Sequence, residues 1–165
     1  MLSITPYSAH HYQALIALFV DFKQESAAVS DVFDELKDNF TPAIALYVDQ
    51  HIARSVSTNV STNVSGILLA MDDDTPVGFI VAEQIAYFPF CKIERIGHIK
   101  ELFVAKSHRG RGLAKRLITE LEAAFYADGI SEFKIETIVH YENNVGFYQS
   151  MGYETFLLDM RKSVR

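Results

Sequence analysis

The pattern of hydrophobic and polar positions predicts helices in the first third of the chain, after one short strand. Leu2–Pro6 alternates as a strand does, and His10–Glu25 repeats apolar residues at helical spacing. A second helical region covers Val32–Asn39. Pro42 then stands where a further helix begins and runs through Ile52.

The middle of the chain predicts a loop followed by a β-hairpin. Ser55–Ser65 repeats the tetrapeptide STNV, which is too polar and too β-branched for a helix, so we expect a loop. Two apolar runs, Gly66–Met71 and Val77–Tyr87, flank the turn-forming sequence DDDTP. The three aspartates also raise calcium binding, but adjacent carboxylates lack the alternating spacing of a calcium loop, which favours a turn.

The second half alternates strand and helix patterns joined by short connections. This order predicts a mixed α/β fold. The expected elements are a strand over Gly97–Val104, a helix over Gly112–Tyr126, a strand over Glu132–His140, a helix over Val145–Met151 and a strand over Tyr153–Met160.

Composition limits the class of protein. A chain of 165 residues, 49% hydrophobic, predicts one domain over 1–165. Its net charge of −6 argues against nucleic-acid and anionic-membrane partners. A lone cysteine forms no internal disulfide or structural thiol metal site, and no apolar run approaches the roughly 20 residues that span a bilayer. We therefore expect a soluble, cytoplasmic protein without a resident metal.

One segment, His98–Phe125, carries the clearest chemistry. It predicts a strand, a loop with two glycines and a helix, and the free N–H groups of a helix start attract anions. A dinucleotide fingerprint would need glycine where Lys115 stands, and no phosphate-binding Walker loop is present. Either the segment binds a phosphorylated ligand or it is an ordinary strand–turn–helix with a basic start. The basic residues are Lys106, Arg109, Arg111, Lys115 and Arg116.

Two motifs resemble one known family. Arg109, Gly112 and Ala114 fit the Arg/Gln-x-x-Gly-x-Gly/Ala signature of the GNAT superfamily of acyl-CoA-dependent N-acyltransferases. Downstream, IETIVHYENNVGFYQSMGY is similar to the family's second signature. The resemblance implies a mixed, mostly antiparallel twisted sheet with flanking helices. That sheet would splay between the strand ending at Val104 and the strand ending at His140, and the gap would hold acetyl-CoA.

The resemblance also implies which residues contact the cofactor. Main-chain groups of Leu102, Phe103 and Val104 would pair with the pantetheine arm as an extra strand does. One of Asn143 and Asn144 would contact CoA. Backbone N–H groups of the loop and helix start would hold the pyrophosphate, and they belong to Arg109, Gly110, Arg111, Gly112, Leu113 and Ala114.

Transfer of an acyl group to an amine needs a neutral nitrogen. A lysine-like amine has a pKa of about 10.4, so we expect a base or a proton-conducting water path. Glu101 is either that base or a strand carboxylate paired with a lysine, and Glu83 and His140 are weaker candidates. By the resemblance, Tyr148 is the general acid to the CoA sulfur; otherwise it is an aromatic of the core or its rim.

The sequence as a whole predicts an N-acetyltransferase that moves the acetyl group of acetyl-CoA to a primary amine by direct attack in a ternary complex. The acceptor is a small molecule or a peptide, and a homodimer is possible. The alternative function is a non-catalytic acyl-CoA-binding module. Tyr87, Phe88 and Phe90 either line the acceptor cleft or pack in the core. Cys91 has no nearby histidine to support an acyl-cysteine route.

Overall fold

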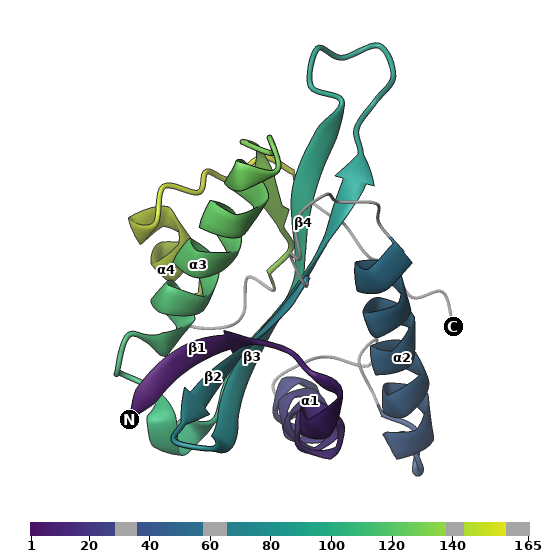
Figure 1. Cartoon of the computed structure of the whole chain (residues 1–165), viewed down its shortest axis with the longest axis vertical. Coiled ribbons are helices and arrows are strands. Elements are labelled where there is room, and N and C mark those ends of the chain that lie inside the picture. Colours follow the sequence, from purple (N-terminus) through teal and green to yellow (C-terminus); the bar gives the residue numbers. More distant parts are fainter. Residues whose placement is uncertain (29–35, 58–65, 138–143, 158–165) are drawn as a thin grey trace, which may run out of the picture.

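The computed structural model describes residues 1–28, 36–57, 66–137 and 144–157, and its elements alternate largely as the sequence predicts (Figure 1). The elements are β1 (Leu2–Pro6), η1 (Ala9–His11), α1 (Tyr12–Ala27), α2 (Thr41–Ser57), β2 (Ile67–Asp72), β3 (Thr75–Ala86), β4 (Arg95–Val104), η3 (Lys106–His108), α3 (Leu113–Ala127), β5 (Phe133–Ile135) and α4 (Asn144–Ser150).

The strands form one sheet in the order β1-β2-β3-β4-β5. The pairs β1–β2, β2–β3 and β3–β4 are antiparallel, and β5 runs parallel to β4. This confirms the expected mixed, mostly antiparallel sheet with flanking helices. The DDDTP segment makes the hairpin turn between β2 and β3, where Asp73 has the left-handed φ of 49° that aspartate tolerates in turns.

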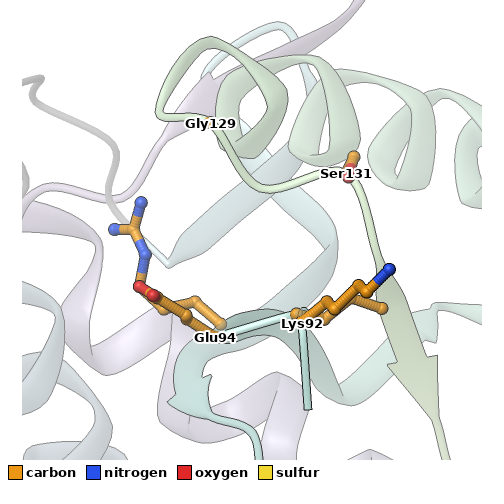
Figure 2. A pocket seen from close by; sticks show the side chains of 6 residues that line it. Lys92, Glu94, Gly129 and Ser131 are labelled. Atoms are coloured by element: carbon orange, nitrogen blue, oxygen red, sulfur yellow. The ribbon is translucent and has the colours of Figure 1, made fainter.

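The long hairpin of β3 and β4 extends beyond the rest of the sheet (Figure 1). At its tip Phe88 and Phe90 stack on each other, with ring centroids 5.4 Å apart, and are 56% and 83% exposed. They therefore do not pack in the core. A hollow of about 320 Å³ lies beside this hairpin, with Lys92 and Glu94 on one wall and the turn after α3 on the other (Figure 2).

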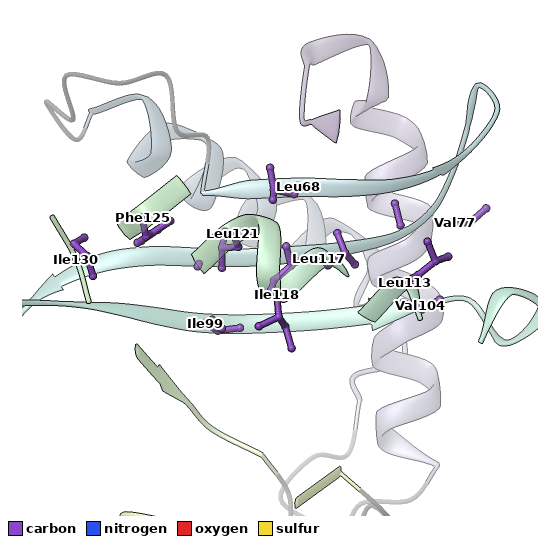
Figure 3. Close-up of a cluster of buried hydrophobic side chains, with 13 residues drawn as sticks. Leu68, Val77, Ile99, Val104, Leu113, Leu117, Ile118, Leu121, Phe125 and Ile130 are labelled. Carbon is purple, nitrogen blue, oxygen red and sulfur yellow. The ribbon is translucent and has the colours of Figure 1, made fainter. Parts of the chain in front are cut away.

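Two cores lie on opposite faces of the sheet, under α3 on one face and under α1 and α2 on the other (Figure 1). On the first face, Leu117 and Leu121 of α3 pack onto Ile99 and its neighbours (Figure 3). The helix has an apolar stripe at helical spacing, which the sheet buries. On the other face the core is aromatic, and Phe19 stacks on Phe79 at 4.2 Å.

Four predicted elements differ from the structure. In the expected helix Val32–Asn39, the described residues 36–39 form no helix but end in a turn at Asp38 and Asn39, residues that bond locally to the backbone. The expected loop Ser55–Ser65 begins later, because α2 continues to Ser57; residues 58–65 lie outside the described part.

The other differences concern strand length. The strand expected over Glu132–His140 is only Phe133–Ile135 as far as residue 137, and the described part of Tyr153–Met160 contains no strand. A strand exists only where a neighbour accepts its hydrogen bonds, and apolar alternation does not reveal that neighbour. The remaining residues of both predicted strands lie outside the described part.

Candidate functional site

One edge of β4 is open beyond its middle. β5 pairs only with Gly97–Ile99, so residues 100–104 have no strand on that side within the described ranges. Ala105 N–H donates to Val77 C=O at 2.8 Å. In an antiparallel pair every second residue directs its N–H and C=O to the partner strand, so Phe103 also bonds toward β3, while the residues between point away from it. Leu102 and Val104 therefore direct their main-chain groups to the open edge. Phe103 directs its own toward β3, so it offers no free main-chain group at that edge, and its expected contact with pantetheine stays a prediction.

The side chain of Arg109 holds the loop after β4 in place. Its Nε donates to Val104 C=O at 2.8 Å, and its guanidinium pairs with Glu25 of α1 at 2.7 Å. It also lies 5.5 Å from the centroid of the Phe103 ring. The backbone N–H of Arg109 donates to Lys106 C=O at 3.3 Å. Arg109 is thus occupied with protein contacts, and the free N–H groups begin at the next residue.

The loop and the start of α3 present a row of backbone donors. Gly110 and Gly112 both have φ of 74°, and Gly112 is the N-cap of α3. A Cβ on either glycine would meet nothing within 4 Å, so the left-handed backbone, rather than space, requires glycine there. Among the described residues, the N–H groups from Gly110 to Lys115 donate to no backbone or side-chain acceptor. Such a row at a helix N-terminus binds anions.

The core fixes the helix that carries this row. Leu113 is 2% exposed and Leu117 is fully buried, so the first turn of α3 is packed onto the sheet. The guanidinium of Arg116 donates to Leu2 C=O of β1 at 3.2 Å. Arg111 and Lys115 remain exposed and make no ion pair with another described residue. They supply positive charge beside the donor row.

Tyr148 of α4 packs against the same core. Its ring lies 5.1 Å from Phe147 and 5.9 Å from Tyr153, and it contacts the cluster of buried residues under α3. Burial raises the pKa of Tyr148 to about 12, which keeps its hydroxyl protonated at neutral pH. The neighbouring Tyr153 hydroxyl, in contrast, donates to Glu122 at 2.6 Å.

Glu101 lies on the opposite face of the sheet, under α1 and α2. Its Oε1 accepts from Lys23 Nζ at 3.0 Å and from the Tyr47 hydroxyl at 2.8 Å. The carboxylate is only 11% exposed and Lys23 is 28% exposed. Of the two readings of Glu101, the structure therefore shows the lysine-paired carboxylate; its role as a base stays a prediction.

A second group of charged side chains lies where β4 pairs with β5. His98 is at its centre, and the sequence did not single it out. His98 is 6% exposed, and its Nε2 lies 3.5 Å from Glu136 Oε1. Burial, together with the positive charges of Lys100 and Lys134, lowers the pKa of His98. The signal in the sequence was the presence of His98 and Lys100 on either side of Ile99, in a strand that is otherwise largely apolar. Glu83 of β3 joins the group through Lys100 at 3.9 Å.

The remaining sequence candidates are only partly placed. Asn144 begins α4, and its Nδ2 donates to Thr137 Oγ1 at 3.4 Å. Asn143 and His140 lie outside the described residues. In the described ranges no group of three or more His, Cys, Asp or Glu side chains is arranged to hold a metal ion. No helix there is long and apolar enough to cross a membrane.

The fold and site define a class of protein: an α/β domain in which an open strand edge leads into a helix start with a row of free backbone N–H groups. The profile of the acetyltransferase (GNAT) family matches residues 29–153. The chain belongs to this family, and it is an acyltransferase. None of the curated proteins matches it.

Solved structures share the fold across nearly the whole chain. A GCN5-related N-acetyltransferase from Ralstonia eutropha JMP134 has a TM-score of 0.72 at 18% identity, covering 99% of each chain. The aminoglycoside N-acetyltransferase AAC(6')-Iy in complex with CoA has a TM-score of 0.71 at 18% identity, covering 100% of this chain and 95% of the other. A transcriptional regulator from Bacillus halodurans C-125 has a TM-score of 0.71 at 12% identity, covering 99% and 100%. At such low sequence identities, the similarity to these structures establishes a shared fold and nothing further.

Proposed function

We propose that this protein transfers the acetyl group of acetyl-CoA to a primary amine of a small cationic molecule, by direct attack in a ternary complex. One observation carries the proposal. The free N–H row from Gly110 to Lys115 is continuous along the chain with the open β4 edge at Leu102 and Val104. A pyrophosphate on that row and a pantetheine amide on that edge are the two contacts that a CoA ester offers in sequence.

The cofactor contacts follow from the same geometry. Main-chain groups of Leu102 and the N–H of Val104 are available to pantetheine, whereas the Val104 carbonyl is already bonded by Arg109. The N–H groups of Gly110, Arg111, Gly112, Leu113 and Ala114 hold the pyrophosphate. Arg109 positions the loop through its side chain. Asn144 stays a candidate CoA contact, together with Asn143.

The chemical step joins the amine nitrogen to the acetyl carbon and breaks the carbon–sulfur bond. Because a neighbouring strand lies about 4.8 Å away, a thioester on the open edge lies beside β4 near Glu101. Glu101 is the proposed proton acceptor for the attacking amine, directly or through water. The proton that the nitrogen loses is the one that finally neutralises the departing thiolate.

Tyr148 assists the departing sulfur. With its pKa raised to about 12, complete proton transfer to a thiolate of pKa about 8.5 would be uphill by about 5 kcal/mol. Its hydroxyl therefore serves as a hydrogen-bond donor to the sulfur as the negative charge develops. Because the hydroxyl keeps its proton near neutral pH, it can donate this hydrogen bond without help from another residue.

The acceptor is proposed to carry several positive charges. The chain has a net charge of −6, which favours the approach of a cationic acceptor over that of an anionic one. The similar fold of an aminoglycoside N-acetyltransferase supports the same kind of acceptor. An aminoglycoside is thus the first acceptor class to assay.

The test is release of free thiol from acetyl-CoA with a panel of aminoglycosides, diamines, amino acids and peptide N-termini. Direct attack predicts intersecting initial-rate patterns and an unaltered rate in Cys91→Ala. Parallel patterns, or loss of activity in Cys91→Ala, would contradict direct attack. Tight CoA binding without turnover of any amine would leave only the acyl-CoA-binding module.

A further inference from the structure

Lys23 is the amine nearest the proposed proton acceptor. It lies in the fourth turn of α1, and its Nζ is 3.0 Å from Glu101 Oε1. The same ammonium lies 4.5 Å from the centroid of the Phe22 ring and 5.9 Å from that of Tyr47. A carboxylate and two aromatic rings thus surround this one ammonium group. These are the groups by which a protein recognises an alkylammonium ligand.

The position of this ammonium relates it to the thioester. Glu101 immediately precedes Leu102, whose main-chain groups face the open edge. A ligand paired there lies about 4.8 Å from β4. Lys23 is 28% exposed and has a flexible four-carbon stem, so its nitrogen can swing from the carboxylate toward the edge. An external amine that uses Glu101 must compete with it.

We propose that Lys23 is an internal acetyl acceptor: in the absence of an external amine, the protein acetylates its own Lys23 from bound acetyl-CoA. This inference rests on the proposed function. The Lys23 ammonium gives one proton to Glu101, and its neutral nitrogen attacks the acetyl carbon. A carbon–nitrogen bond forms and the carbon–sulfur bond breaks. The second nitrogen proton then passes to the thiolate, so the products are N-acetyl-Lys23, CoA thiol and the proton on Glu101.

The acetylated state has a structural consequence. The amide nitrogen of acetyl-lysine carries no charge, so the ion pair with Glu101 is lost and the carboxylate becomes available to another amine. Self-acetylation therefore precedes full turnover of external amines. Progress curves from unmodified protein are expected to begin with a lag, and protein preincubated with acetyl-CoA is expected to show none.

The experiment incubates the whole chain with acetyl-CoA alone and follows each lysine by peptide mass spectrometry. Lys92, exposed at the tip of the hairpin, reports the uncatalysed background. We expect Lys23 to be acetylated at least about 10²-fold faster than Lys92, the usual gain from a positioned base. The rate constant should not change with protein concentration, since the reaction is internal.

Two variants separate catalysis from simple exposure. Glu101→Gln should slow acetylation of Lys23 by about 10²-fold and leave Lys92 unchanged. Lys23→Arg keeps a positive charge beside Glu101 but should accept no acetyl group and show no preincubation effect. Equal rates at Lys23 and Lys92, a rate proportional to protein concentration, or no effect of Glu101→Gln would overturn the proposal.

The same preparations are assayed with the amine panel. This assay separates failure of the Lys23 proposal from failure of the proposed function. Turnover of an external amine with Lys23 unmodified would remove the internal acceptor and leave the proposed function intact. No thiol release with any amine and no acetyl-Lys23 would remove both.

Discussion

The two faces of the sheet are built in different ways. On the α3 face, a strand, a loop and a helix that are consecutive in the chain form the row of donors, and the contacts beneath them are apolar. On the α1 and α2 face, the polar contacts join segments far apart: Lys23 and Tyr47 reach Glu101, which lies 78 and 54 residues away. In the proposed function, the first face binds the cofactor and the second binds the acceptor.

This difference teaches where specificity is encoded. A pyrophosphate is recognised by backbone N–H groups, which every residue except proline has, so the sequence needs only glycines and a helix start. An amine acceptor is recognised by side chains brought together by folding. If the division is real, substitutions on each face should change different kinetic constants.

The largest effect is expected at Gly112. Valine there would force a β-branched residue to adopt φ of 74°, so the loop must change shape and the donor row is lost. We expect kcat/KM for acetyl-CoA to fall by about 10²-fold or more, as misplaced binding groups do. The control is Gly129→Val, which imposes similar strain at φ of 80° after α3. Equal losses in both variants would mean that the donor row is not the cofactor site.

Tyr148→Phe tests the proposed hydrogen bond to the departing sulfur. Removing the hydroxyl should lower kcat by about 10²-fold with little change in either KM, because the hydrogen bond to sulfur strengthens only in the transition state. Tyr153→Phe is the matched control. It removes a hydroxyl bonded to Glu122 at 2.6 Å, which should cost about 1 kcal/mol of stability and leave kcat unchanged. An unaltered kcat in Tyr148→Phe would exclude its proposed role.

A smaller effect is expected from Glu25→Gln, which frees the guanidinium of Arg109. Partly exposed ion pairs contribute roughly 1 kcal/mol or less, so KM for acetyl-CoA should rise by about 2- to 5-fold. KM for the amine should not change. Glu120→Gln, which breaks the exposed pair with Arg116, is the control and should alter neither constant. A change in the amine KM alone would place Glu25 on the acceptor side.

The smallest effect concerns pH and stability. Because burial lowers the pKa of His98 in the folded state, the unfolded chain binds this proton more readily on acidification. The stability that the neutral imidazole allows is therefore complete above its ordinary pKa of about 6.5 and is lost as pH falls below it. Melting temperatures between about pH 7.5 and 5.5 should fall less steeply in His98→Gln than in the unaltered protein. The same slope in both would show that His98 does not titrate on unfolding.

Local patterns predicted most elements because their causes are local. The apolar stripe of Leu113, Leu117 and Leu121 indicates a buried helix wherever the sheet lies. The region 36–39 was predicted incorrectly, since turn-forming Asp38 and Asn39 prevail over a weak helical pattern. β5 was predicted too long, because strand ends depend on a partner from another part of the chain.

The sequence by itself determined the donor row and its glycines, since a left-handed turn before a helix is set by consecutive residues. Only the tertiary structure decided three other matters. It paired Glu101 with Lys23 and Tyr47, it turned the main chain of Phe103 toward β3, and it buried His98 between charged neighbours. Each depends on segments that approach one another only when the sheet and helices pack. The spacing of residues along the chain does not indicate which of these distant segments will be in contact.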